Sequence, residues 1–266
     1  ILFVVLIVFL FTVPLLPVQY LSVRFDRFFH KSLPRFWHRI IAKLLGLRVH
    51  VTGDLVQDRP LLIAANHSSW ADIIVMSTVA EVSFIAKSEV RDWPLFGMFA
   101  VLQRSVFVER EQKHRSGQQA NTIAERLAKG DVMVLFAEGT TSDGNRVLPF
   151  KSSLFGAAQL ALRNTGTHRV LVQPVSIAYT KVHGLPLGRY MRPVASWPGS
   201  VTLLPSLLAM LREGALDVEV RIGEPIEFTP KSSRKAVACD MEAKVRVMML
   251  TSLMGRPVTQ PILNEP

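Results

Sequence analysis

The chain opens on a long apolar pattern, since residues 1–23 carry no charged side chain. A helix rises about 1.5 Å per residue, so this length can cross the ~30 Å hydrocarbon core of a bilayer. Pro14 and Pro17 favour a kinked span or a re-entrant pair of short helices. A cleaved signal peptide is the alternative, which we disfavour because no small-residue cleavage site follows the apolar stretch. We therefore predict that residues 1–48 form a membrane-anchoring helical segment.

Basic residues follow this stretch, and apolar residues recur among them at helical spacing. An excess of Lys and Arg beside a membrane segment marks its cytoplasmic side. The spacing predicts a basic amphipathic helix. We favour a helix that lies in the lipid interface over one that packs on a protein core, because it follows the uncharged segment. The basic residues are Arg24, Arg27, Lys31, Arg35, Arg39, Lys43 and Arg48, and the apolar ones are Phe36, Trp37, Ile40, Ile41, Leu44 and Leu45.

From residue 49 onward, short apolar or alternating runs alternate with longer stretches of helical spacing. This order predicts an α/β fold with a mixed, mostly parallel sheet flanked by helices, in one domain over residues 49–255. The Pro-rich residues 256–266 are predicted to be a disordered tail. The predicted strands are 48–52, 61–65, 82–86, 106–108, 132–136, 169–179 and 216–222, and the predicted helices are 71–79, 95–102, 115–129, 153–163, 203–211 and 230–255.

The composition adds a lipid partner to this picture. Apolar residues make up 49% of the 266 residues, and the mean hydropathy of +0.27 is high for a soluble domain. The formal charge of +10 suits nucleic acid, anionic lipid or an acidic carrier protein. The sequence has no RNA-binding signature, zinc-ligand cluster or recognition-helix pattern. We therefore expect a membrane bilayer as partner, and no nucleic acid, metal or cofactor.

Candidate chemistry lies between the predicted strand 61–65 and the helix that follows it. His67 stands where the strand ends, and Asp72 follows five residues later. A turn into a helix can fold that spacing back so that the carboxylate fixes the imidazole tautomer and strengthens it as a base. This is a Ser-His-Asp arrangement without its serine, which indicates a base acting on a hydroxyl of the substrate. The alternative is that Asp72 only caps the helix, and the pair by itself favours that alternative.

The full segment Asn66-His67-Ser68-Ser69-Trp70-Ala71-Asp72 resembles the first conserved block, Asn-His-x-Ser-x-x-Asp, of the glycerolipid acyltransferase family, which contains the lysophosphatidate acyltransferases. Three further blocks follow in the family's order, and together they cover roughly residues 61–175. They are Glu109-Arg110 of block two, Ala137-Glu138-Gly139-Thr140-Thr141-Ser142 of block three, and Val172-Gln173-Pro174-Val175 of block four.

The resemblance implies roles for several residues outside the first block. Arg110 matches the arginine that binds the acceptor's head group, and two parallel hydrogen bonds from an arginine suit an oxyanion. Glu138 and Gly139, with Thr140 beside them, are expected to place that head group. Lys87 and Lys151 are weaker candidates for binding it. The alternatives are that Arg110 is a surface charge and that Glu138 is a solvated residue beside a turn glycine.

Three positions depart from the family pattern. Arg104 stands where block two has glycine, Ala137 replaces the proline of block three, and Thr141 replaces its arginine. The missing guanidinium normally helps to bind a phosphate head group. Either other basic residues compensate, or the acceptor is not lysophosphatidate. The segment 140–153 resembles the bacterial branch that includes lyso-ornithine lipid acyltransferases, and both acceptors stay open.

The family activity implies a reaction at the cytoplasmic face of a bacterial inner membrane. His67, steadied by Asp72, removes a proton from the hydroxyl of a lyso-lipid. The oxygen then attacks the thioester of acyl carrier protein or acyl-CoA, and backbone N–H groups near the turn are expected to stabilise the oxyanion. Two alternatives are a hydrolase that uses Ser68 or Ser69 as nucleophile and a non-catalytic lipid-binding protein. The first lacks a Gly-x-Ser-x-Gly elbow, and the second has no need of the intact pair.

Overall fold

A computed structural model describes residues 2–25, 29–108, 113–164, 168–198 and 202–255. Its strands form one sheet in the order β1-β8-β6-β2-β5-β3-β4, with β7 and β9 paired to β6. Predicted residue Arg110 and the predicted tail 256–266 lie outside the described residues. The strands are β1 (Leu47–Thr52), β2 (Leu61–Ala65), β3 (Ser83–Lys87), β4 (Val106–Val108), β5 (Val132–Phe136), β6 (Val170–Val182), β7 (Leu185–Pro186), β8 (Leu216–Ile222) and β9 (Ile226–Phe228).

Strand directions confirm the predicted mixed, mostly parallel sheet. β2 pairs in parallel with β5 on one side and with β6 on the other, and β3 is parallel to both β4 and β5. β8 runs antiparallel to β6 and parallel to β1. The carboxyl ends of β2, β5 and β6 therefore meet at one edge, which is where parallel sheets place their ligand sites.

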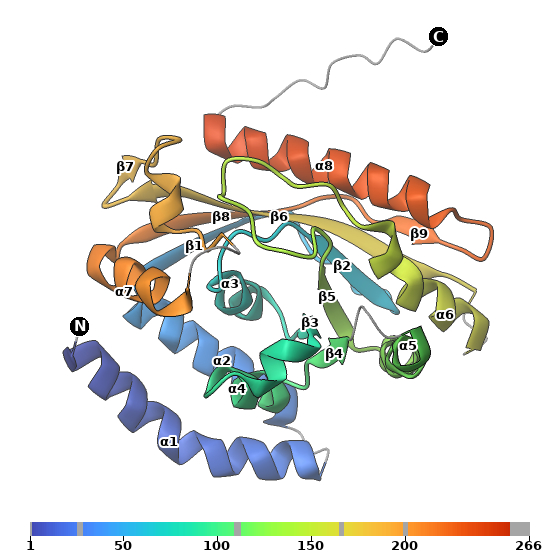
Figure 1. Cartoon of the computed structure of the whole chain (residues 1–266), viewed down its shortest axis with the longest axis horizontal. Helices are drawn as coiled ribbons and strands as arrows, with labels where there is room; N and C mark the ends of the chain where they lie inside the picture. Colours follow the sequence, from blue (N-terminus) through green and yellow to red (C-terminus); the bar gives the residue numbers. More distant parts are fainter. Residues whose placement is uncertain (1, 26–28, 109–112, 165–167, 199–201, 256–266) are drawn as a thin grey trace.

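Two apolar cores lie on opposite faces of the sheet, because side chains alternate along each strand. In β2, Ile63 belongs to the core under α2 and α3, whereas Leu62 belongs to the core under α5, α6 and α8. Figure 1 shows α3 and α8 on opposite sides of the sheet. The helices are α1 (Leu2–Arg24), α2 (Phe29–Leu44), α3 (Asp72–Val79), α4 (Phe96–Leu102), α5 (Lys113–Ala128), α6 (Gly156–Asn164), α7 (Leu203–Glu213) and α8 (Arg234–Met254).

The apolar N-terminal stretch is a single helix, α1, which runs through both Pro14 and Pro17. The predicted pair of short re-entrant helices is therefore wrong. By length and composition α1 is a candidate membrane span. It lies along α2 (Figure 1), where the indole Nε1 of Trp37 donates to the Thr12 hydroxyl at 2.9 Å. Near its other end, Gln19 donates to the carbonyl of Leu102 at 2.7 Å, which joins α1 to α4.

The amphipathic helix α2 forms as predicted, but most of its apolar face packs inside the protein. Ile41 and Leu45 are buried in the core beneath the sheet, and α2 packs along α3. Phe36 is 53% exposed and contacts the ring of Phe11 in α1. The preference for a helix lying in the lipid interface is therefore wrong for Ile41 and Leu45, since the sheet competes for the same apolar side chains.

Strand β6 runs through the centre of the sheet, and its neighbour changes along its length. Residues 170–172 pair with β9, and pairing with β8 begins at Val175. Pro174 lies at this change of partner, where its carbonyl accepts from the N–H of Gly223 at 2.9 Å. On this side of β6 neither β8 nor β9 pairs with position 174, so a residue without an N–H is tolerated there, while on the other side Pro174 lies opposite Ala64 of β2. The sequence pattern predicted neither β7 nor β9, which are two and three residues long.

Candidate active site

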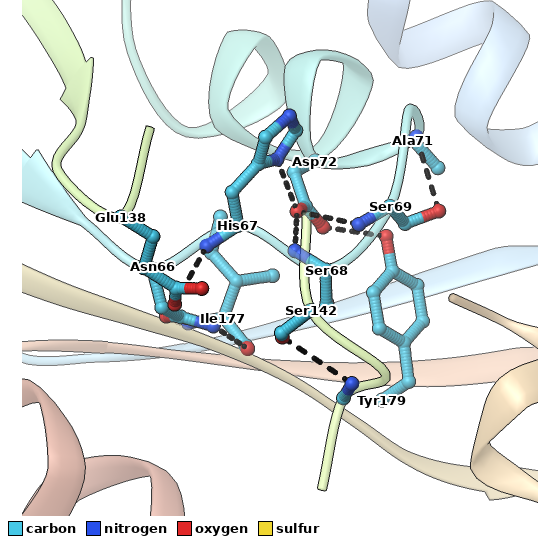
Figure 2. A network of polar contacts seen from close by, with 11 residues as sticks. Asn66, His67, Ser68, Ser69, Ala71, Asp72, Glu138, Ser142, Ile177 and Tyr179 are labelled. Atoms are coloured by element: carbon cyan, nitrogen blue, oxygen red, sulfur yellow. Dashed lines mark hydrogen bonds and ion pairs between the residues drawn. The ribbon is translucent and has the colours of Figure 1, made fainter. Parts of the chain in front are cut away.

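The turn between β2 and α3 brings the imidazole of His67 onto the carboxylate of Asp72. Nδ1 of His67 lies 2.8 Å from Oδ2 of Asp72. The same oxygen accepts the backbone N–H groups of Ser68 at 2.7 Å and Ser69 at 2.9 Å (Figure 2). The carboxylate therefore stabilises the turn that carries its own imidazole partner. The predicted pairing of His67 with Asp72 is confirmed.

Asp72 does not act as the helix cap that the alternative required. The residue at the cap position of α3 is Ala71, which makes no side-chain capping bond. Asp72 is the first helical residue, and its carboxylate points back toward the preceding turn. Its side chain is fully buried, so its charge depends on the hydrogen bonds it accepts.

Tyr179 supplies a further bond to this carboxylate from the central strand β6. Its hydroxyl donates to Oδ1 of Asp72 at 2.9 Å (Figure 2). Burial raises the pKa of the Tyr179 phenol well above its usual value, and the charge of Asp72 adds to the rise. The phenol therefore stays a protonated donor. Tyr179 was missed from the sequence, because it lies 107 positions from Asp72 and reads as one more apolar residue of a buried strand.

The ring of His67 is held between its carboxylate partner and an aromatic surface. It stacks on Phe136 with ring centroids 3.9 Å apart and planes at 11°, and Phe136 stacks in turn on Phe84. The His67 side chain remains 16% exposed. Since Nδ1 donates to Asp72, Nε2 carries the lone pair, and it points away from the carboxylate (Figure 2). This nitrogen can take a proton from a group that approaches from outside.

Asn66 fixes the end of β2 against β6. Its amide donates to the carbonyl of Ile177 at 2.9 Å and accepts the Ile177 N–H at 2.8 Å. The side chain thereby continues the strand pairing beyond the last residue of β2. The sequence motif contained this asparagine, but its spacing alone predicted no role for it.

Glu138 supports the same turn from the end of β5. Its Oε1 accepts the backbone N–H of His67 at 3.2 Å, and the residue is almost fully buried. Burial raises the pKa of Glu138 to about 8, the charges of Asp72 and Glu242 add to the rise, and backbone hydrogen bonds from His67 and Leu148 oppose it. The carboxyl group is therefore mostly protonated at neutral pH. The alternative of a solvated glutamate is wrong, and the predicted role in placing a head group stays a prediction.

Gly139 closes the tight turn that follows β5. Its φ is +72°, a conformation that costs other residues about 1–2 kcal/mol. Its N–H donates to the carbonyl of Phe136 at 3.0 Å. Arg104, which stands where the family has glycine, also has a left-handed φ of +58°. The backbone therefore keeps a glycine-like conformation at Arg104 without a glycine.

The remaining predicted residues lie at the same sheet edge but do not join the dyad. Lys87 is exposed at the end of β3, which lies two strands, or about 10 Å, from β2. Thr140 and Lys151 are exposed, although the N–H of Lys151 donates to the carbonyl of Ala137 at 2.9 Å. Within the described residues, none of these three side chains forms a hydrogen bond or ion pair with the dyad. Their binding roles stay predictions, as does that of Arg110.

The mixed sheet therefore carries a His–Asp pair at the carboxyl end of its second strand. Residues 47–178 match the family model described as Acyltransferase. The chain is 57% identical over 246 residues to a lyso-ornithine lipid O-acyltransferase of Brucella abortus, with 92% of both chains covered. The chain belongs to the acyltransferase family.

Two further relatives are similar over most of the chain. A lyso-ornithine lipid O-acyltransferase of Rhizobium meliloti is 53% identical over 242 residues, which cover 91% of this chain and 83% of the relative. The crystal structure of the 1-acyl-sn-glycerophosphate acyltransferase PlsC from Thermotoga maritima is similar with a TM-score of 0.59 at 25% identity. The similarity covers 86% of this chain and 81% of that one.

Replacing Tyr179 by Phe removes the donor to Oδ1 of Asp72 and leaves the ring in place. The carboxylate that orients the imidazole is then held less firmly, because one of its hydrogen bonds is lost. We expect kcat for acyl transfer to fall by about tenfold, with KM for the acceptor nearly unchanged. Tyr190→Phe, at a tyrosine that is 93% exposed, is the matched control. Wild-type kcat in Tyr179→Phe contradicts the positioning role.

Replacing Glu138 by Gln tests the buried carboxyl group, whose pKa rises from 4.5 to about 8 on folding. The folded protein binds this proton more tightly than the unfolded chain does. The resulting stability is complete below pH 4.5 and is lost as the pH rises to 8. Relative to Glu138→Gln, the free energy of unfolding of the wild type should fall by roughly 4 kcal/mol between about pH 5 and 8.5.

Urea unfolding of both proteins in the same detergent at each pH measures this difference. All other titrating groups are shared, so they cancel in the comparison. Parallel pH dependence in the two proteins is the outcome that contradicts a neutral Glu138.

Proposed function

We propose that the protein is a lysolipid O-acyltransferase that moves a fatty acyl group from acyl carrier protein or acyl-CoA to the hydroxyl of lyso-ornithine lipid. The observation that carries the proposal is the 2.8 Å contact between His67 and Asp72, which leaves Nε2 available to a substrate. The family supplies the reaction class, and the geometry supplies a base that lacks a nucleophile of its own.

The chemistry follows from the dyad. Nε2 of His67 takes the proton of the acceptor hydroxyl while the oxygen attacks the thioester carbonyl. The tetrahedral intermediate collapses by breaking the carbon–sulfur bond, and the imidazolium returns its proton to the thiolate. Asp72 stabilises the imidazolium throughout and keeps its ring in one orientation. The products are the O-acylated lipid and the free thiol, so protons and bonds balance without another reactant.

The oxyanion that forms in this step must be stabilised by donors other than the N–H groups of His67, Ser68 and Ser69. The N–H groups of Ser68 and Ser69 donate to Asp72, and that of His67 donates to Glu138. The expectation that N–H groups of this turn bind the oxyanion is therefore wrong for these three residues. Their role is to hold the base in place.

The acceptor is proposed from the relatives together with one substitution. Two relatives at more than 50% identity carry the name lyso-ornithine lipid O-acyltransferase. Thr141, where the family has arginine, removes a guanidinium suited to a phosphate. Lysophosphatidate is the second candidate acceptor, since the similar Thermotoga maritima protein is named as an acyltransferase for it.

The proposed location is the cytoplasmic face of the inner membrane of a bacterium. Helix α1 exposes apolar side chains along its length, among them Phe3, Phe9 and Leu10. The basic residues that follow it suit an anionic leaflet, and the charge of +10 suits acidic carrier protein and the phosphates of CoA.

The two rival functions fit the site less well. In a serine hydrolase the nucleophile donates to the base, but Ser69 Oγ accepts from the N–H of Ala71 at 3.3 Å and buried Ser68 Oγ has no partner among the described residues. A non-catalytic lipid-binding protein has no use for a buried carboxylate that orients an imidazole.

The dyad is tested by His67→Ala and Asp72→Asn in the purified protein, with labelled acyl donor and lyso-ornithine lipid as acceptor. His67→Ala should lower kcat by about 10²- to 10⁴-fold, because general base catalysis is worth that much. Asp72→Asn keeps the shape but loses the charge, and we expect a loss of similar size.

The matched control is His50→Ala. His50 and Asp217 form a second pair with nitrogen and oxygen 2.9 Å apart, but the His50 side chain is 59% exposed and lies on the edge strand β1. This variant should keep wild-type turnover. Wild-type turnover in His67→Ala or Asp72→Asn would rule out the proposed mechanism.

A further inference from the structure

We infer that three side chains around Gly144 bind the carboxylate of the acceptor's amino-acid head group. We call them the Gly144 cluster. A Cβ placed on Gly144 would lie 3.7 Å from the Cβ of Ser196 and 3.9 Å from those of Arg192 and Ser68. The inference rests on the proposed function and deepens it, because it identifies what recognises the acceptor.

One polar atom from each of these three side chains is buried without a hydrogen-bond partner. Ser68 Oγ, Ser196 Oγ and Arg192 Nε are all shielded from solvent, and none has a hydrogen-bond partner among the described residues. Each such group costs about 1–3 kcal/mol when it is left unpaired. All three can donate a hydrogen bond, so an acceptor such as an oxygen of an anion can satisfy them.

The cluster lies directly beside the dyad. Ser68 follows His67 in the chain, and the N–H of Trp197 donates to the Ser68 carbonyl at 2.6 Å. The loop that carries Gly144 is fixed to the same turn, because the N–H of Ser142 donates to the carbonyl of His67 at 2.8 Å. The inference therefore places the acceptor's carboxylate close to the base that acts on its hydroxyl.

The charges around the cluster suit a head group with both signs. The guanidinium of Arg192 is partly buried, and its Nη1 donates to Asn145 at 2.7 Å. Burial lowers the pKa of the Arg192 guanidinium. The negative charge of Asp143 opposes this decrease, and the positive charge of Arg189 adds to it. Arg192 still carries its charge at any physiological pH. Ornithine presents a carboxylate for Arg192 and an ammonium group for Asp143.

This cluster also accounts for the substitution at Thr141. The family arginine that Thr141 replaces precedes Gly144 by three positions in the same loop. In this chain a guanidinium reaches the loop from a different segment, η3 (Arg192–Val194). A cation in a changed position, with the charge of Asp143 nearby, matches a zwitterion better than a phosphate.

The test compares lyso-ornithine lipid and lysophosphatidate as acceptors for the purified protein. A hydrogen bond to a charged group contributes about 1.5–3 kcal/mol, so Arg192→Gln should raise KM for lyso-ornithine lipid by about 10- to 100-fold with kcat nearly unchanged. Arg192→Lys should restore only part of the affinity for lyso-ornithine lipid, because an ammonium group lacks the planar hydrogen-bonding fork of a guanidinium. Arg189→Gln, at an exposed neighbour, is the control and should match the wild type.

Ser196→Ala separates binding from folding. Removing a buried hydroxyl that has no partner should leave thermal stability unchanged or higher, while KM for lyso-ornithine lipid rises several-fold. A serine with a purely structural role gives the opposite result, a lower stability and an unchanged KM, which would count against the inference.

Unchanged KM in Arg192→Gln and Ser196→Ala, with transfer intact, overturns the inference and leaves the proposed function standing. Equal rises in KM for both acceptors overturn the choice of a carboxylate.

If the wild type acylates neither lipid, the proposed function fails instead. Calorimetric titration of lyso-ornithine lipid into His67→Ala then tests the cluster separately: adding Arg192→Gln should weaken binding at least tenfold, and unchanged binding refutes it.

Discussion

The buried carboxylate of Asp72 is the group on which the geometry of the site depends. It accepts hydrogen bonds from the imidazole of His67, from the N–H groups of Ser68 and Ser69, and from the hydroxyl of Tyr179. A charge without solvent is tolerated only when its oxygens are satisfied in this way. The four donors come from the turn and from the central strand, so a single charge fixes the base, the start of α3 and its distance from the sheet.

A second carboxyl group, that of Glu138, lies close to this one in different surroundings. Asp72 accepts four hydrogen bonds, whereas Glu138 is buried with few hydrogen-bond donors and has a pKa raised to about 8. Burial with few donors stabilises a carboxyl group as a neutral acid. The neutral Glu138 can support the backbone of His67 without adding a negative charge that competes with Asp72 for the imidazole proton.

Much of this arrangement could be predicted from local sequence. Strands β2, β5 and β8 begin and end at the predicted residues, because apolar runs specify β2 and β5 and an alternating run specifies β8. The pairing of His67 with Asp72 is predicted from the whole segment 66–72 and its family resemblance, because the five-residue spacing alone favours a helix cap. Tyr179 and Arg192 could not be found this way, since only the folded sheet brings residues so distant in sequence to the turn. The burial of Ile41 in α2 escaped prediction for a related reason: an apolar face does not reveal what covers it.

The central claim is that Asp72 holds the proton of a neutral imidazole on Nδ1, so that Nε2 is the base. Nitrogen NMR of the protein with labelled histidine, recorded in detergent at alkaline pH, measures this directly. We predict that His67 shows a protonated Nδ1 and an unprotonated Nε2, and that Asp72→Asn abolishes this preference. A proton found on Nε2 in the wild type would contradict the account.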